Sequence, residues 1–169
     1  MSDDLISAVV RDPQQFGDLF EAMLHEDPIV RGRAANAVDE LSRNRPDLLA
    51  PYRKRLIDEV GQVEQPEVRR RVALMLSRIR LDPKERSRAV ALLERYLHDK
   101  SVSLVLASIE TLVDFSQEDR HLRKRVTSIV ERMAKRGTPS MQTRAKKLLM
   151  RLQKQTSAPT KTSARNLSS

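Results

Sequence analysis

One short phrase occurs three times in this sequence, and this repetition limits the fold more than any other feature. The copies share a proline, an apolar residue two positions later and an arginine three positions after that. They span residues 27–34, 65–72 and 138–145. A fainter copy begins at Asp99, so the four starts are 38, 34 and 39 residues apart. Repetition at this period predicts a stack of similar units, each burying its apolar face against the next.

The composition favours helices with an aliphatic core. Hydrophobic residues make up 39% of the 169 residues, but aromatic residues make up only 3% and there is no Trp. Only 4 glycines are present, which disfavours tight hairpins and glycine-rich phosphate loops. Charged residues reach 33%, as is typical of helices with long solvated faces. The sequence therefore predicts an all-α fold.

Several absences point to a cytoplasmic protein. The chain contains no Cys, which excludes disulfides and thiol catalysis and suits a reducing compartment. The first residues are acidic, where a signal peptide would be basic. No apolar run approaches the ~20 residues that span a bilayer. We expect a cytoplasmic location and no membrane partner.

The net charge of +9 is unevenly distributed along the chain. Residues 1–44 carry 4 basic and 9 acidic groups, whereas residues 117–169 carry 14 basic and 3 acidic groups. An acidic start and a basic end bear on the choice of partner and on electrostatic steering rather than on the fold.

Prolines mark the expected helix starts, because proline suits the first turn of a helix. The apolar spacing after them predicts four antiparallel helix pairs. The first helices of the pairs are expected at 13–25, 46–62, 83–98 and 118–136. The second helices are expected at 28–43, 66–80, 101–115 and 139–154.

These pairs define one repeat domain, residues 1–154. Its repeats are expected at 13–45, 46–82, 83–117 and 118–154. An apolar segment at 3–11, preceded by a possible N-cap at Ser2, predicts a short capping helix over the first pair. Residues 155–169 change to Ser, Thr, Ala and Lys, which predicts a disordered tail.

The repeated phrase resembles that of HEAT repeats, which are paired helices stacked into a right-handed α-α superhelix. The first copy fits at Asp27, Pro28, Val30 and Arg31, and the second fits at the corresponding Pro, Val and Arg. The third copy has Ser103 where the arginine should be, and the fourth keeps little besides its proline, its later arginine and the apolar spacing. The Trp-Leu-Gly-Tyr and Thr-Pro-Leu-His landmarks of tetratricopeptide and ankyrin arrays are absent. The resemblance implies a HEAT-like solenoid of about four helix pairs.

A helical wheel separates structural arginines from candidate functional residues. Arginines at the flanks of the core stripe face the neighbouring repeats, so we expect them to join repeats through carboxylates or helix-end carbonyls. These flanking positions are Arg31, Arg69 and Gln142 on one side, and Arg33, Arg71 and Arg144 on the other.

The far side of each second helix has no packing role on the wheel. It carries Asn36, Asp39 and Arg43 in the first repeat. In HEAT-like stacks the second helices line the concave face, so the resemblance implies a groove that becomes more basic toward its C-terminal end. The residues expected to bind a partner there are Arg43, Arg70, Arg78, Lys146, Lys147, Met150 and Lys154. The alternative interpretation is a solvated charged face that serves solubility.

The second helix of the third repeat is apolar nearly all round and has no basic residue between Val102 and Phe115. One interpretation is that it is the best-buried helix of the stack. The other is an apolar patch in the groove, with Leu104 and Phe115 as anchors for a partner helix.

Catalysis is not expected. The three histidines are far apart in sequence, no pair has metal-ligand spacing, and no serine lies in an elbow motif. The sequence therefore predicts a monomeric, cofactor-free scaffold or adaptor that binds an acidic or amphipathic segment of another protein. The alternative is a nucleic-acid-binding protein that contacts the phosphate backbone through its basic C-terminal repeat.

Overall fold

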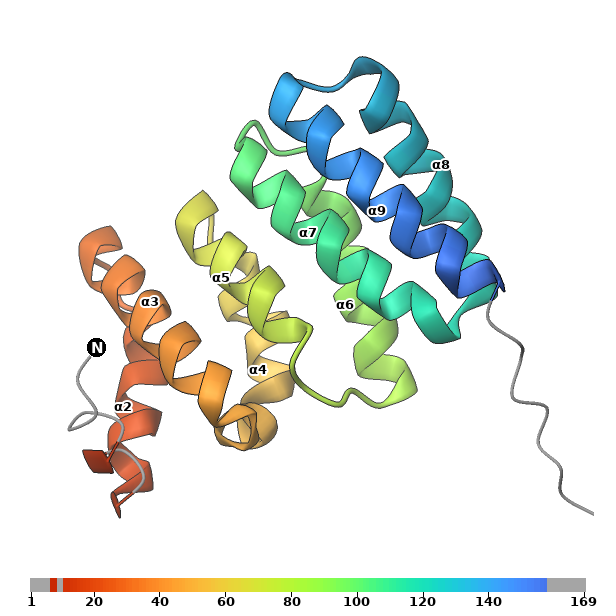
Figure 1. The fold of residues 1–169 in the computed structure, drawn as a ribbon. Coiled ribbons are helices and arrows are strands. Elements are labelled where there is room, and N and C mark those ends of the chain that lie inside the picture. Colours follow the sequence, from red (N-terminus) through yellow and green to blue (C-terminus); the bar gives the residue numbers. More distant parts are fainter. Residues whose placement is uncertain (1–6, 9–10, 158–169) are drawn as a thin grey trace, which may run out of the picture. The chain divides into compact units, whose positions relative to one another are not determined.

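The computed structural model describes residues 7–8 and 11–157, and within these residues every regular element is a helix (Figure 1). The prediction of an all-α fold is therefore confirmed. The chain forms two compact units: unit 1 is Met1–Phe115 and unit 2 is Ser116–Ser169. Most of the expected capping helix at 3–11 lies outside the described residues, as do residues 158–169.

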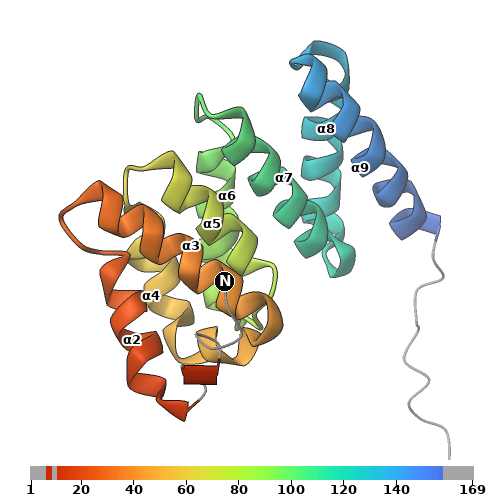
Figure 2. The same cartoon turned by 60° about the vertical axis from the view of Figure 1, so that its left-hand side comes forward.

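Unit 1 contains three helix pairs arranged in two layers (Figures 1 and 2). The second helices α3, α5 and α7 lie side by side in one layer, and the first helices α2, α4 and α6 form the other. The first layer consists of α3 (Pro28–Asn44), α5 (Pro66–Leu76) and α7 (Val102–Phe115). The other consists of α2 (Pro13–Ala22), α4 (Arg53–Asp58) and α6 (Pro83–Tyr96), with short 3-10 helices η1 (Pro46–Tyr52) and η2 (Val60–Gln62) on either side of α4.

Aspartates before the prolines start three of these helices. The Asp12 carboxylate accepts a hydrogen bond from the backbone N–H of Gln14 at 3.0 Å, and that of Asp27 accepts one from Ile29 at 2.8 Å. Asp82 forms a reciprocal capping box with Glu85 at the start of α6. Each cap satisfies backbone donors that have no partner inside the helix, so an Asp-Pro pair acts locally as a start signal.

The prediction of a single helix at 46–62 is wrong. The chain there forms η1, α4 and η2 in succession. Pro51 lies inside the first of these elements, where it has no N–H to donate and blocks a regular α-helical turn. The second helix expected at 66–80 is also shorter than predicted, because α5 ends at Leu76.

The core of unit 1 is aliphatic, as the composition predicts, and α7 is its most apolar helix. Leu104 is fully buried and Phe115 is only 9% exposed. The interpretation of α7 as a well-buried helix is therefore confirmed, and that of an exposed apolar patch with these two anchors is wrong. Three of the five Phe and Tyr side chains, Phe16, Phe20 and Tyr52, pack together, and the ring of Tyr52 stacks on that of Phe20 with centroids 4.4 Å apart.

Unit 2 is a helical hairpin. It begins with the 3-10 helix η3 (Ser116–Glu118), followed by α8 (Arg120–Arg136) and α9 (Pro139–Ser157). An apolar seam of Leu122, Val126 and Val130 on α8 faces a matching seam on α9. The last helix, expected at 139–154, continues three residues further, to Ser157.

Gly61, in η2, provides a test of the packing of this element against α6. A β-carbon at this position would lie 2.6 Å from Cδ2 of Leu92 and 3.1 Å from the backbone oxygen of Leu56. The Tyr96 hydroxyl donates a 2.6 Å hydrogen bond to the Gly61 carbonyl, so the backbone cannot move away without losing it. We expect Gly61→Ala to lower the free energy of unfolding by about 1–3 kcal/mol in urea denaturation.

The matched control is Ser87→Ala on the exposed face of α6. It should change the free energy of unfolding by no more than about 0.5 kcal/mol. Equal stability of Gly61→Ala and the wild type would show that the contact with α6 is not tight.

Candidate interaction surfaces

The contact between α3 and α5 is built around a fully buried carboxylate, Asp39. Arg71 Nη1 lies 2.5 Å from its Oδ2, and Arg78 Nη2 lies 2.7 Å from its Oδ1. Arg43, one turn further along α3, approaches Oδ2 at 3.1 Å. One buried negative charge therefore gathers three arginines, from α3, from α5 and from the turn that follows α5.

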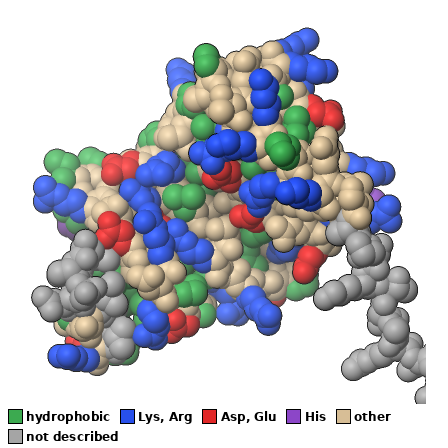
Figure 3. All heavy atoms as spheres, in the orientation of Figure 1, with side chains coloured by type: hydrophobic (Ala, Val, Ile, Leu, Met, Phe, Trp, Pro, Cys, Tyr) green, Lys and Arg blue, Asp and Glu red, His purple; other side chains and the backbone are tan. Residues whose placement is uncertain are grey.

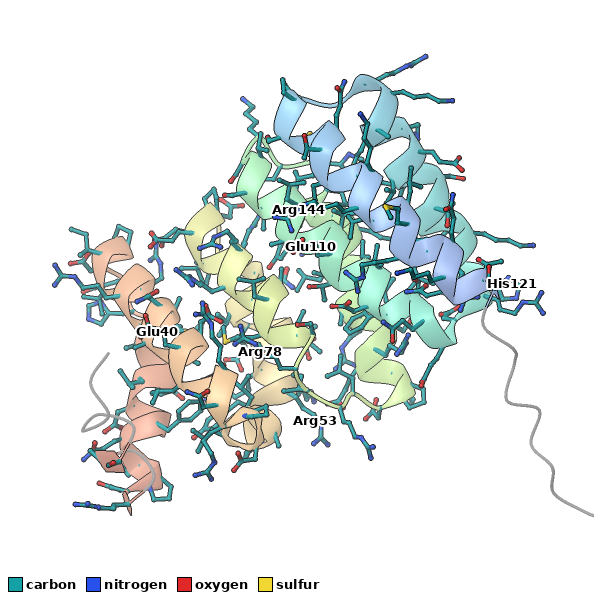
Figure 4. All side chains as sticks on the ribbon, viewed as in Figure 1. Glu40, Arg53, Arg78, Glu110, His121 and Arg144 are labelled. Atoms are coloured by element: carbon teal, nitrogen blue, oxygen red, sulfur yellow. The ribbon has the colours of Figure 1, made fainter. Side chains whose placement is uncertain are left out.

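Arg78 is held at this contact by more than its charge. Its Nη1 donates hydrogen bonds to the backbone oxygen of Asp39 and to Oγ of Ser42, both at 3.0 Å. Its side chain is only 20% exposed, on the α5 side of the contact (Figure 4). The expectation that Asp39 lies on a side of α3 without packing is wrong, and Arg78 has a structural role in this contact.

The ion pairs determine the charge state of Asp39. Burial raises the pKa of the Asp39 carboxyl, but the hydrogen bond from Arg71 and the positive charge of Arg78 outweigh that effect. The net result is a pKa below its ordinary value, so the group is ionised in the folded protein at neutral pH.

Further contacts join the repeats along the same layer. Arg31 donates to Gln65 Oε1 at 3.0 Å and to the carbonyl oxygens of His25 and Glu26, and Arg69 Nη1 lies 3.8 Å from Asp99 Oδ2. The predicted structural role of the flanking arginines is confirmed for Arg31, Arg69 and Arg71. Arg33, by contrast, is exposed and forms no ion pair with the described residues.

The exposed face of the α3–α5–α7 layer has mixed charge. Arg43 is the most exposed member of the Asp39 cluster, with 53% of its side chain accessible, and Arg70 on α5 is half-buried. Acidic groups lie on the same layer, at Glu40 on α3 and Glu110 on α7 (Figure 4). Figure 3 shows blue and red side chains intermixed over this face of unit 1.

The outer side of α9 is different, because this helix has no acidic residue. Lys147, Met150 and Lys154 are exposed and lie on one stripe opposite the buried seam, with Lys146 at its edge. Met150 is 60% exposed, one of only two large apolar side chains described as exposed. The part of the chain that the structure describes offers no ion pair to these three lysines. The structure thus places Lys146, Lys147, Met150 and Lys154 together on one surface.

A groove on unit 2 lies along the outer side of α8 and has a volume of about 760 Å³. It is lined mainly by cations, hydroxyls and amides. The lining residues include Arg120, Arg123, Lys124, Thr127, Ser128 and Gln155. Arg123 closes its base by donating to the carbonyl oxygens of Ser116 at 3.2 Å and Gln117 at 2.6 Å. The charge pattern of the sequence indicated a basic end, but gave no sign of this groove.

The described residues include no group of three His, Asp or Glu side chains that could hold a metal ion. Across these same residues, no helix is both long and apolar enough to cross a membrane.

Comparison with known proteins agrees with the geometry of unit 1. A family model described as HEAT repeats matches residues 16–113, which span α2 to α7. The chain belongs to the HEAT-repeat family. Searches of curated proteins and of solved structures found no match to it. HEAT repeats generally mediate protein–protein interaction, and proteins built from them are typically non-enzymatic scaffolds.

The Asp39 cluster was the main structural feature that the sequence reasoning missed in these HEAT repeats. A signal for it exists on α3, where Ala35, Asp39 and Ser42 follow helical spacing beside the apolar stripe and are all buried. Small and polar residues at that spacing widen the buried face toward the next helix. An aspartate within such a stripe has to meet a cation, and α5 and the turn after it supply one each.

Replacing Asp39 by Asn tests the cluster. The amide keeps the shape but removes the charge, and it leaves Arg71 and Arg78, whose side chains are mostly covered, without an anion. We expect a loss of about 3 kcal/mol in the free energy of unfolding at neutral pH, measured by urea denaturation. Asp47→Asn, which breaks an exposed pair with Arg45, is the matched control and should change stability little.

The difference in the free energy of unfolding between wild type and Asp39→Asn should depend on pH in a defined direction. Because the folded-state pKa of Asp39 lies below its ordinary value of 3.8, its stabilising effect is complete above that value and is lost as the pH falls through the lower folded-state pKa. The difference between wild type and Asp39→Asn should thus be the same at about pH 7 and pH 5 and shrink at about pH 3. A difference that grows on acidification would contradict the depressed pKa.

Proposed function

We propose that this protein is a non-enzymatic scaffold that binds an acidic or amphipathic segment of another protein. The observation that carries the proposal is the α9 stripe of Lys147, Met150 and Lys154. It combines an exposed apolar side chain with cations that have no acidic partner among the described residues. Membership of the HEAT-repeat family supports a protein as the partner.

The chemistry of the stripe fits an amphipathic helix. Methionine is unbranched and polarizable, so it adapts to apolar partners of different shapes. The lysines keep their charges in water and can attract carboxylates that flank an apolar anchor. A partner helix with Leu and Glu at helical spacing would satisfy both features, whereas a basic partner would be repelled.

Unit 1 contributes to the proposed binding function with fewer residues than the sequence predicted. Arg43 and Arg70 are accessible enough on the α3–α5–α7 layer to meet carboxylates of a partner, whereas Arg78 is occupied by Asp39 and Ser42. The intermixed acidic groups there favour a partner with charges of both signs. A monomeric state and a cytoplasmic location complete the proposal, the latter because the chain has no Cys.

The test uses charge reversal on α9. A fluorescent amphipathic helical peptide with Leu on one face and Glu on its flanks serves as the probe, and binding is followed by anisotropy. We expect Lys147→Glu/Lys154→Glu to weaken binding at least tenfold, and Met150→Ala to weaken it several-fold, with helicity and Tm unchanged. A peptide with Lys in place of Glu should not bind.

The control for net charge is Lys84→Glu/Lys100→Glu, which makes the same charge change at exposed positions of unit 1. It should retain the affinity of the wild type for the peptide. If the α9 variant also retains it, the stripe is not the binding surface. Capture from native lysate with wild type and the α9 variant then identifies the natural partner as the protein lost from the variant.

A further inference from the structure

We propose that unit 2 carries a second binding surface, the outer side of α8, which binds the phosphate backbone of duplex nucleic acid. Arg120, Lys124 and Lys135 are exposed on one side of this helix, away from its buried seam. Arg132 lies at the edge of the same side and is also exposed. From Arg120 to Lys135 the cations extend over about 22 Å of helix, at a rise of about 1.5 Å per residue.

The groove beside these cations supplies the donors that phosphate oxygens need. Thr127 and Ser128 contribute hydroxyls from α8, whereas the hydroxyl of Thr156, at the end of α9, already donates to the backbone oxygen of Leu152 at 3.1 Å. Most protein contacts to a nucleic-acid backbone are made by such groups together with Arg and Lys. The groove therefore combines long-range attraction with short-range hydrogen bonding.

The acidic residues in the groove limit the surface but do not neutralise it. Glu131 lies on the same side of α8, and Glu118 lies at the edge of the groove. Four exposed cations remain against these two carboxylates. Arg123 is not counted, because it already donates to the carbonyl oxygens of Ser116 and Gln117.

The lack of apolar exposure on α8 favours nucleic acid over a protein or a membrane. The two large apolar side chains described as exposed are Ile29 and Met150, and neither lies on this helix. A protein interface would need an apolar centre, and a membrane-surface helix would need apolar side chains to insert between lipids. A phosphate backbone needs only cations and polar donors.

The lack of aromatic residues favours a duplex over a single strand. No Phe, Tyr or Trp occurs in residues 116–169, so the imidazole of His121 is the one aromatic ring that unit 2 offers to an unpaired base. Single-strand binding depends heavily on such stacking. The surface is therefore suited to an intact duplex and to binding without sequence preference.

Fluorescence anisotropy with a random-sequence duplex of ~20 base pairs tests this surface, with salt varied from ~50 to ~200 mM. For about four phosphate contacts we expect log K to fall with log salt with a slope of about −3.6. Arg120→Glu/Lys124→Glu should weaken binding at least tenfold at ~50 mM salt and reduce the slope by about 2. A single strand of the same length should bind more weakly than the duplex.

Two control variants distinguish duplex binding at this surface from an effect of the net positive charge of the protein. Lys84→Glu/Lys100→Glu makes the same charge change in unit 1 and should lose much less affinity for the duplex. Lys147→Glu/Lys154→Glu should lose affinity for the acidic peptide but retain affinity for the duplex. Arg120→Glu/Lys124→Glu should retain affinity for the peptide and lose affinity for the duplex. Equal loss of duplex binding in all three variants would overturn the proposal. So would negligible duplex binding at ~50 mM salt, or binding to anionic vesicles in preference to the duplex.

Discussion

Asp39 places a full negative charge where α3 meets α5, and the two helices can bury this contact only because arginines compensate the charge. The requirement is directional. Arg71 lies on α5 and Arg78 lies in the turn two residues after its last residue, so both can reach the same carboxylate only when α3 and this segment are in one register. A slide by one turn would leave at least one buried charge unpaired, which makes the carboxylate a determinant of register as well as of stability.

The same requirement decides which cations are available to other molecules. In unit 1 several arginines of the second helices meet a carboxylate or an amide of a neighbouring repeat, as Arg31 and Arg69 do. The first helices are joined in the same way, by Arg55 with Glu21 and by Arg88 with Asp58. Acidic residues thus engage several arginines of unit 1 in contacts between repeats. On α9 such pairing cannot occur within the helix, because it has no acidic residue.

The sequence was a good guide to the fold, since proline and apolar spacing are local signals that follow from the geometry of a helix start and a helix face. It failed where one residue changed local geometry, as Pro51 did in the helix expected at 46–62. The prediction of partner-binding residues failed for a different reason. A helical wheel treats Arg78 and Lys147 alike, because it shows the face of one helix and not the carboxylate on the next. Arg78 is largely buried against Asp39, whereas Lys147 is exposed.

The two surfaces proposed on unit 2 belong to opposite sides of one hairpin, because each lies away from the apolar seam that α8 and α9 share. Each helix with its side chains is about 10 Å across, so the two sets of cations are separated by roughly 20 Å. The Debye length is about 8 Å at physiological ionic strength and about 30 Å at 0.01 M salt. At physiological salt an anion on one surface is therefore largely screened from the other, and the hairpin could hold an acidic protein segment and a duplex together. At low salt the two anions would repel each other through the hairpin, and each would weaken the other's binding without sharing a contact.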